Sequence, residues 1–429
     1  MEVTNTKRIL FVGYNFSPEL TGIGKYSGEM MHWLAQKGHK CTVLTSYPYY
    51  PYWKIQQPYR KRRFWYKKEV TNFDSGGKLR VIRCPMYIPN KPSGIKRMLL
   101  DSTFTLSAFL LSIPLLFVKK YDRIITIAPS FQLGLLGVFY KKIRGAKHIH
   151  HIQDMQIEAA QDLGMITSPK LLKMLYGIEK FIFKNTDIIS SISDGMIEKI
   201  ERKALKPVSF FPNWTETKNF YPIENNGQLK RQFGFHPSDY VVLYSGGIGE
   251  KQGLEAILHS AKELNSYKSL QFIICGTGPY KTVLQEKTHE MKLNNVHFMP
   301  LQPKECFNEF LNMADLHLVI QKEKASDLVM PSKLTTILAV GGVSLITANP
   351  KSSLYRVVTK HHMGILVAPE DQEALNKGIL TGLNKKDNND IKKAARNYAK
   401  NYLAIDTVMN NFNDKITTEH KTTALQFVD

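Results

Sequence analysis

The sequence predicts an α/β protein with two domains, each built on a doubly wound parallel sheet. Its length of 429 residues exceeds one typical hydrophobic core and suits two domains of about 200 residues. Short apolar runs typical of buried strands alternate with amphipathic helical patterns along both halves. Glycine-containing turns join several of these runs to the helices that follow them. Together these features favour parallel strands linked by right-handed helical crossovers.

The first such unit lies near the N-terminus. Strands are predicted at Ile9–Val12 and Cys41–Thr45, with a helix between them at Lys25–Gln36. The loop before the helix holds Gly22 and Gly24. Their spacing differs from the G-x-G-x-x-G pattern that directly follows a strand in dinucleotide-binding domains, so NAD binding is disfavoured.

Positive charge is concentrated in the first half of the chain. The 58 Lys+Arg exceed the 37 Asp+Glu by a net +21. Residues 1–210 hold 33 basic and 15 acidic residues, a net +18, and residues 53–123 alone hold 16 basic and 4 acidic. Such a patch attracts nucleic acid, an anionic membrane surface or a phosphorylated substrate. Because the basic residues flank an apolar segment and follow no nucleic-acid motif, nucleic acid is the disfavoured partner.

The apolar segment Met98–Val118 is 21 residues long and is bracketed by basic pairs. That length would span a bilayer, but Asp101, Pro114 and several hydroxyl side chains weaken this interpretation. A buried helix of a sheet domain would also be apolar. With the basic surroundings of residues 53–123, the pattern favours a helix that lies in the membrane interface.

The alternation of strands and helices resumes after this segment. Residues 1–214 form the predicted N-terminal domain, and the polar, irregular stretch 215–238 is the predicted linker. A strand predicted at 147–152 contains His151 near its end, and Asp154 follows shortly after it. These two residues either make half-buried hydrogen bonds or, at the carboxyl edge of the sheet, contact sugar hydroxyls and exchange protons.

The second half repeats this architecture over a predicted domain at 239–404. A C-terminal helix and tail are expected over 405–429. The strands are predicted near residues 241–244, 270–275, 295–299, 315–320, 343–347 and 364–367.

The leading candidate for a ligand site is the turn after the strand Val241–Tyr244. Gly246 and Gly247 would let the backbone approach a ligand closely, and free N–H groups at a helix start favour an anion. Lys251 either neutralises that anion or is an ordinary solvated lysine of a strand-to-helix connection.

Other residues would gather at the same edge, because parallel sheets bind ligands outside the carboxyl ends of their strands. Two ammonium groups and a helix start could hold a diphosphate there. No Asp-x-Asp motif and no metal-spaced cluster of Asp, His or Cys occurs, so no metal and no other cofactor is expected. The residues expected at this edge are Gly276, Gly278, Leu301, Asp327, Ser332 and Lys333.

Cysteine usage and the N-terminal residues suggest a cytoplasmic protein. The four cysteines are far apart and form no C-x-x-C pair, as expected in a reducing compartment. Only six apolar or small residues follow Lys7-Arg8, too few for a signal-peptide core. We expect a protein that associates peripherally with the inner face of the plasma membrane.

Several of these segments also carry a resemblance. From residue 8 to residue 400 the chain is similar to the WcaI-type glycosyltransferases of colanic acid and related exopolysaccharide pathways, which belong to retaining glycosyltransferase family four. The resemblance implies a GT-B fold, two Rossmann-like domains that face a cleft. The second domain would bind a nucleotide-sugar and the first a lipid-linked saccharide acceptor. The matching segments are TGIGKY at 21–26, YPYYP at 47–51, HIQD at 151–154, FFPNW at 210–214, YSGGIGEKQGLE at 244–255, HLVIQK at 317–322 and MPSKLTTILAVGG at 330–342.

The resemblance also implies roles for the candidate residues. Lys251 and Lys333 would neutralise the donor diphosphate, assisted by N–H groups at Ser332 and at Gly22–Gly24. The nucleobase would be bordered by Leu301 and the Gly276–Gly278 turn, and the donor sugar would be faced by His151.

The chain departs from the wider family at its sugar-binding positions. Many members carry two glutamates eight positions apart, where this chain has Leu328 and Thr336. Thr336 would offer a hydroxyl, and Asp327 is the nearest carboxylate that could take over sugar binding.

These features favour a metal-independent, retaining hexosyltransferase that uses a GDP- or UDP-linked sugar, with GDP-fucose as the candidate donor. The alternative, suggested by the missing glutamates, is a non-catalytic, membrane-docked scaffold that partners another transferase.

Overall fold

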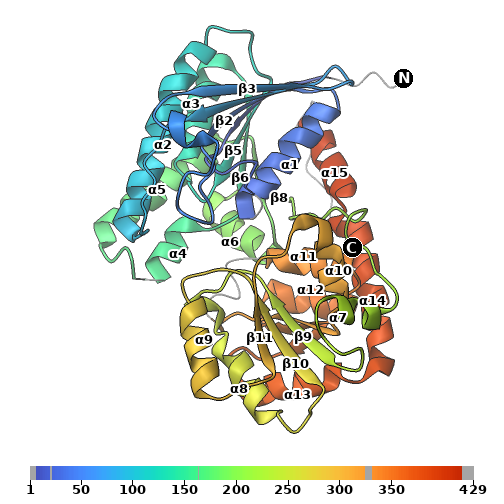
Figure 1. Cartoon of the computed structure of the whole chain (residues 1–429). Coiled ribbons are helices and arrows are strands. Elements are labelled where there is room, and N and C mark those ends of the chain that lie inside the picture. The colour runs from blue at the N-terminus through green and yellow to red at the C-terminus, as the bar shows by residue number, and fades with distance from the viewer. Residues whose placement is uncertain (1–5, 20–21, 163, 324–330, 418–429) are drawn as a thin grey trace. The chain divides into compact units, whose positions relative to one another are not determined.

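The computed structural model describes residues 6–19, 22–162, 164–323 and 331–417. The chain divides into two compact units (Figure 1). Unit 1 combines the residues up to Phe211 with those from Met409 onward, and unit 2 runs from Pro212 to Val408. Each unit is built on its own sheet, which confirms the predicted pair of α/β domains.

Unit 1 contains a sheet that has eight strands within the described residues. Their order is β3-β4-β2-β1-β5-β6-β7-β8, and all pairings are parallel except that of β3 with β4. The edge strand β3 was not predicted, because all six of its residues are at least partly exposed and its sequence, KKEVTN, is polar. The strands are β1 (Arg8–Val12), β2 (Lys40–Ser46), β3 (Lys67–Asn72), β4 (Lys78–Cys84), β5 (Arg123–Ala128), β6 (Lys147–Ile152), β7 (Ile188–Ser191) and β8 (Val208–Phe210).

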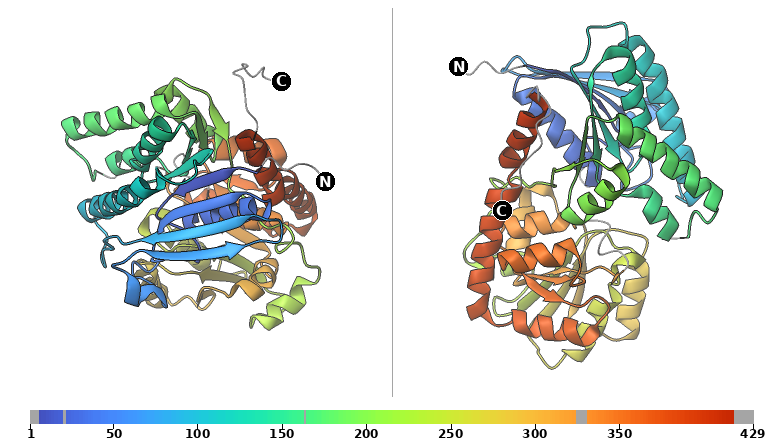
Figure 2. Two further views of the ribbon diagram at one scale, coloured as in Figure 1. Left: turned by 90° about the horizontal axis from the view of Figure 1, so that it is seen from above. Right: turned by 180° about the vertical axis from the view of Figure 1, so that it is seen from behind.

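Helices cover both faces of this sheet. Helix α1 lies on one side, and α2, α3 and α5 lie on the other (Figure 2). The helices of unit 1 are α1 (Gly22–Gln36), the short 3₁₀ helix η1 (Tyr59–Arg62), α2 (Gly94–Leu115), α3 (Leu133–Arg144), α4 (Gln156–Asp162), α5 (Pro169–Asn185) and α6 (Asp194–Ala204).

Helix α2 contains most of the predicted apolar segment. By length and composition, Lys96–Leu115 is able to cross a membrane, and 39% of its most apolar window is buried inside the protein. Phe104 and Ala108 are fully buried in the core against the sheet, whereas Leu106 is 60% exposed and Leu110 53% exposed. The helix therefore packs one face on unit 1 and leaves an apolar face uncovered.

Unit 2 contains a parallel sheet that has six strands within the described residues, in the order β11-β10-β9-β12-β13-β14. All six strands were predicted from apolar runs. They are β9 (Tyr240–Ser245), β10 (Leu270–Cys275), β11 (Val296–Met299), β12 (Leu316–Val319), β13 (Ser344–Thr347) and β14 (Ile365–Val367).

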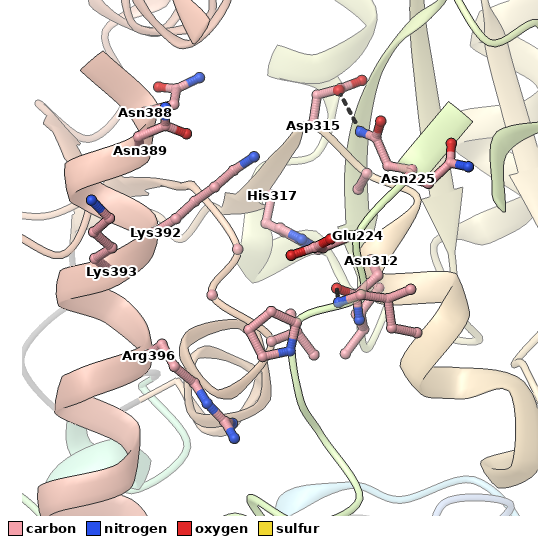
Figure 3. Close-up of a pocket in the computed structure, with 18 of the residues that line it drawn as sticks. Glu224, Asn225, Asn312, Asp315, His317, Asn388, Asn389, Lys392, Lys393 and Arg396 are labelled. Carbon is pink, nitrogen blue, oxygen red and sulfur yellow. Dashed lines mark hydrogen bonds between the residues drawn. The ribbon is translucent and has the colours of Figure 1, made fainter. Parts of the chain in front are cut away.

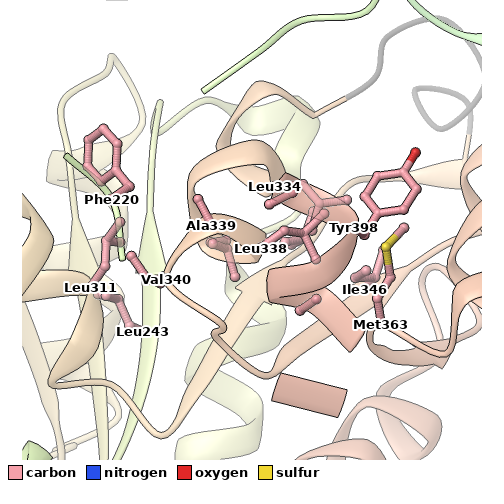
Figure 4. Packing of buried hydrophobic residues seen from close by; sticks show 14 of the residues in the cluster. Phe220, Leu243, Leu311, Leu334, Leu338, Ala339, Val340, Ile346, Met363 and Tyr398 are labelled. Carbon is pink, nitrogen blue, oxygen red and sulfur yellow. The ribbon is translucent and has the colours of Figure 1, made fainter. Parts of the chain in front are cut away.

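Residues alternate between the two faces of this sheet, as the period of a strand requires. Val242 and Tyr244 of β9 pack with α8, α9 and α13, whereas Val241 and Leu243 pack with α10, α11 and α12 (Figure 4). The helices of unit 2 are α7 (Asn226–Gln232), η2 (Glu250–Gln252), α8 (Glu255–Glu263), α9 (Lys281–Glu290), η3 (Lys304–Cys306), α10 (Phe307–Asn312), α11 (Ser332–Ala339), α12 (Ser353–His361), α13 (Gln372–Gly382), α14 (Lys385–Tyr398) and the π-helical turn η5 (Ala399–Leu403). The last helix, α15 (Ile405–Thr417), is shared between the two units.

The predicted linker 215–238 is part of unit 2 and not a free connection. It contains α7 and buries Phe220 and Leu229 in the core. Its Lys230 is 1% exposed and forms an ion pair with Asp315, with Nζ 2.6 Å from the carboxylate oxygen. The segment is polar and contains two prolines and an Asn-Asn-Gly run, which is why the sequence predicted a linker there.

Helix α15 begins in unit 2 and ends in unit 1. Phe412 stacks on Phe211, with ring centroids 4.2 Å apart, and Nε of Arg123 donates a hydrogen bond to the carbonyl of Ile416 at 2.6 Å. The helix predicted within 405–429 is thus integral to the first domain, and the predicted tail at 418–429 lies outside the described residues.

Candidate active site

The turns after β9 and β10 lie against each other at the carboxyl edge of the unit 2 sheet. A Cβ at Gly276 would stand 1.9 Å from the carbonyl oxygen of Gly246, and one at Gly278 would stand 2.0 Å from that of Ile248. The two turns are also joined by a hydrogen bond from the Ile248 N–H to the Thr277 carbonyl at 2.9 Å. Only glycine fits such an approach of two backbones, so Gly276 and Gly278 first serve to pack the turns. Their place beside the nucleobase stays a prediction.

Lys333 lies beside these turns, in the first turn of α11. Its Nζ stands 3.7 Å from the centre of the Tyr244 ring, and a Cβ at Gly246 would be 3.6 Å from it. The Tyr244 hydroxyl donates a hydrogen bond to the carbonyl of Gly247 at 2.6 Å, which fixes the ring beneath the lysine. The fold thus places Lys333 beside Gly246, and the Tyr244 ring under the lysine is held by the carbonyl of Gly247. Their contact with the donor diphosphate stays a prediction.

The ammonium of Lys333 is buried and has no hydrogen-bond partner among the described residues. Burial lowers its pKa to about 7, because the charged form loses its hydration. A buried cation without a counter-ion is costly, and an anion beside it restores the lost interactions. The adjacent start of α11 adds N–H groups that also favour negative charge. This corner of unit 2 therefore has the electrostatics of an anion site.

The remaining unit 2 candidates are placed less decisively. Ser332 is the exposed first residue of α11, and Leu301 follows β11 and is 43% exposed. The hydroxyl of Thr336 already donates to the carbonyl of Lys333 at 3.0 Å. Lys251 lies in η2, but its side chain is not among those described, and Asp327 lies outside the described residues. Their proposed contacts with the donor stay predictions.

In unit 1, the structure places His151 in the interior. The ring is 2% exposed, Nδ1 lies 3.0 Å from the Ser190 hydroxyl, and Phe211 packs edge-on at 4.9 Å. Burial lowers the pKa of His151 to about 3, so the ring is neutral at physiological pH and poorly suited to proton exchange there. Asp154, in the loop after β6, is half-buried. A sugar-facing role for either residue stays a prediction.

The two glycines of the first loop shape the start of α1. Gly22 has a φ of +61°, and a Cβ at Gly24 would stand 2.4 Å from Oε2 of Glu19. Glu19 is buried and accepts hydrogen bonds from the backbone N–H groups of Tyr49 and Tyr50, each at 3.0 Å. Gly24 thus makes room for a carboxylate that ties two loops together, and Gly22 supplies the left-handed backbone turn before it. Their expected contact with the donor diphosphate is a prediction still.

Sequence reasoning missed a titratable group on α2. Asp101 is 5% exposed and accepts a hydrogen bond from Nε2 of Gln156 at 2.7 Å. Burial raises the pKa of Asp101 to about 6 and that of the neighbouring Tyr14 well above its usual value. Gln156 and Tyr14 follow the carboxyl ends of β6 and β1, so this carboxyl stands at the ligand-binding edge of unit 1. The signal for this group in the sequence was an acidic residue inside the apolar segment Met98–Val118.

Among the described residues, no group of three or more His, Cys, Asp or Glu side chains is arranged to hold a metal ion.

Both units match known protein families. Residues 225–401 match the family described as "Glycosyl transferases group 1", and residues 21–214 match the "Glycosyl transferase 4-like domain". A protein of Escherichia coli (strain K12), named as the colanic acid biosynthesis glycosyl transferase WcaI, is 38% identical over 415 residues. The match spans 94% of this chain and 98% of that protein.

Solved structures show the same architecture. Sucrose-phosphate synthase from Thermosynechococcus elongatus has a TM-score of 0.72 at 17% identity, covering 95% of this chain and 98% of that one. HepE of Anabaena, solved in complex with UDP-glucose, has a TM-score of 0.65 at 12% identity, covering 96% and 99%.

Two parallel-sheet units with these matches define a glycosyltransferase of the GT-B fold. Within that class, the chain belongs to the WcaI-type glycosyltransferase family, as its similarity to the Escherichia coli protein over nearly the full length of both chains shows.

Proposed function

We propose that the protein transfers a hexosyl group from a nucleotide-sugar to a lipid-linked exopolysaccharide intermediate, with retention at the anomeric carbon and without a metal ion. Fucosyl from GDP-fucose is the leading candidate for the transferred group. The name of the Escherichia coli relative supports a role in colanic acid synthesis, and the UDP-glucose complex of HepE supports a nucleotide-sugar donor.

The observation that carries this proposal is the buried ammonium of Lys333, which has no hydrogen-bond partner among the residues that the structure describes. The diphosphate gains negative charge as the glycosidic bond breaks. A fixed cation next to a helix start stabilises that charge more in the transition state than in the ground state. The hydroxyl of the acceptor then attacks on the face that the diphosphate leaves, and a diphosphate oxygen takes its proton.

The acceptor is proposed to reach unit 1 from a membrane surface. The exposed face of α2 adjoins the segment 60–66, because the Tyr66 hydroxyl donates to the carbonyl of Ser107 at 2.9 Å. That segment exposes four consecutive basic residues, Arg60–Arg63, followed by Phe64, 71% exposed, and Trp65, 75% exposed. Basic and aromatic side chains beside an apolar helix face suit an anionic lipid surface at the inner side of the plasma membrane.

The transfer reaction is tested with variants of Lys333. Lys333→Ala removes both charge and stem, and Lys333→Met removes only the charge. Each is expected to lower turnover by about 10²–10³, the scale of losing one electrostatic donor. Product formation is measured with GDP- and UDP-linked sugars and a lipid-linked acceptor, after a thermal-shift panel has identified the nucleotide that binds.

The matched control is Lys377→Ala, which removes an exposed lysine of α13. It should leave turnover unchanged. Wild-type turnover in both Lys333 variants would contradict the assignment of the diphosphate site. Absence of transfer from every donor with the wild-type protein would instead favour the non-catalytic scaffold.

A further inference from the structure

A cavity lies in unit 2, away from Lys333. Its volume is about 720 Å³, within the range of small-molecule sites. Tyr240 and His317 in its wall belong to the amino-terminal ends of β9 and β12, whereas Lys333 stands at the carboxyl end of β9. The wall is completed by the 222–226 segment, the turn after α11 and one side of α14 (Figure 3).

His317 supplies an unsatisfied polar atom to this cavity. The residue is 1% exposed, and its Nε2 has no hydrogen-bond partner among the described residues. Burial lowers the pKa of His317 to about 4, so the ring is neutral. In a neutral imidazole one nitrogen donates and the other accepts, so the unpartnered Nε2 can make one hydrogen bond in either role.

Gly342 packs closely against this edge of the ring. A Cβ there would stand 2.8 Å from Nε2 of His317, and Gly342 itself lines the cavity. A side chain at this position would therefore displace the ring.

Cationic side chains face the same space from α14. Lys392 extends toward the middle of the cavity (Figure 3), and its charge is near enough to contribute to the lowered pKa of His317. Lys393 also lines the cavity, and both lysines are exposed and make no ion pair with a described residue. An anion would find two ammonium groups there.

Other charges around the cavity are already engaged in the fold. Asp315 is paired with Lys230 at 2.6 Å and accepts from Nδ2 of Asn226 at 2.9 Å. Arg396 donates to the backbone carbonyls of Thr217, Phe220 and Ala339. The exposed carboxylate of Glu224 lies at the rim, where it can accept from a hydroxyl.

We propose that this cavity is a second ligand site, which binds a small anionic polyol such as a sugar phosphate. A hydroxyl of the ligand forms a hydrogen bond with Nε2 of His317, and the anionic group lies against Lys392 and Lys393. An apolar ligand would leave Nε2 unsatisfied, and a cation would be repelled by the lysines. The site is separate from the diphosphate site, so it does not depend on the identity of the donor.

The test uses the full-length protein and glucose 1-phosphate as the probe. Hydrogen–deuterium exchange is expected to show protection in peptides that cover 222–226 and 388–397. By calorimetry, Lys392→Glu should weaken binding at least about tenfold, because an attractive charge becomes repulsive. Glucose without the phosphate should bind more weakly than glucose 1-phosphate.

Lys377→Glu is the matched control for the same charge change at an exposed helical lysine outside the cavity. It should leave the dissociation constant and the protected peptides unchanged. Protection at the β9 turn alone, no binding at millimolar probe, or equal effects of the two substitutions would each overturn the proposal.

Discussion

Lys333 shows how the fold prepares a single side chain for chemistry. Its ammonium lies over the ring of Tyr244, and the Tyr244 hydroxyl is held by the carbonyl of Gly247. The aromatic face partly replaces water around the cation, which lets the charge remain buried without a carboxylate from the part of the chain that the structure describes. A carboxylate in that place would compete with the incoming diphosphate.

The pH dependence of nucleotide binding follows from this arrangement. In the free protein the pKa of Lys333 is about 7, and a bound diphosphate raises it by stabilising the charged form. At pH values between the pKa of Lys333 in the free protein and its pKa in the complex, binding therefore takes up a proton. Below pH 7 the lysine is already charged, and above it the affinity for UDP should fall by up to about tenfold per pH unit. Calorimetry in buffers of different ionisation enthalpy measures both the affinity and the number of protons taken up.

Lys333→Met provides the control for this dependence. The variant should bind UDP weakly and show no proton uptake attributable to this position. A wild-type affinity that stays constant from neutral to alkaline pH would show that Lys333 is not the group that titrates.

At the scale of elements, α2 has a buried and an exposed apolar face, which the sequence could not separate. Its length and hydropathy pass for a membrane span, and a core helix can pass in the same way. The structure shows that Phe104 and Ala108 belong to the core of unit 1, and a spanning helix would have to withdraw them from it. Only one face of α2 is available to lipid.

Membrane docking predicts a specific sensitivity to the aromatic residues beside α2. Phe64→Ser with Trp65→Ser should weaken binding to vesicles that contain phosphatidylglycerol by about tenfold or more, since each ring loses apolar burial of about 1.5–3 kcal/mol. Co-sedimentation measures the partition. Tyr267→Ser, which removes a 46% exposed aromatic residue of unit 2, serves as the control. Equal binding by all three proteins, or a preference for RNA over vesicles, would count against docking.

At the scale of the whole molecule, the chain passes from unit 1 to unit 2 near Phe211 and returns near Met409. The returning helix supplies Phe412, which is 4% exposed, to the interior of unit 1. The stability of the N-terminal domain thus depends on residues at the far end of the sequence.

Phe412→Ala should therefore destabilise unit 1 selectively. The loss of a stacked, buried phenylalanine lowers the free energy of unfolding by about 3–5 kcal/mol. Phe210→Ala is a matched control, because Phe210 is 46% exposed and its loss should change stability little. Differential scanning calorimetry separates the transitions of the two units, and an unchanged unit 1 transition in Phe412→Ala would contradict the prediction.

The regular parts of both sheets were predictable because buried parallel strands are nearly continuous apolar runs. Strand β3 was not, since it is polar and exposed, and the polar composition of 215–238 concealed that Lys230 is buried in an ion pair. For the site, the sequence led to Gly246 through the turn after β9 and to Lys333 through the helix start at Ser332, and their contact with a donor stays a prediction. The same patterns gave no sign of Tyr244 as the ring beneath the lysine, because that contact joins two segments far apart in the chain.

The cavity beside His317 could not be predicted from the sequence for the same reason. Its wall draws on the 222–226 segment, β12 and α14, and no local pattern marks residues so widely spaced. The pKa of Asp101 depends on burial by a packed core, which also has no local signature.

The course of α15 has a consequence for engineering. A chimera that grafts residues 1–211 of a relative onto this chain would join a foreign Phe211 position to the native Phe412. The two rings are stacked, so both surfaces of that contact would have to be exchanged as a pair. Exchange of the whole of unit 1 thus requires two crossover points, one after residue 211 and another before residue 409.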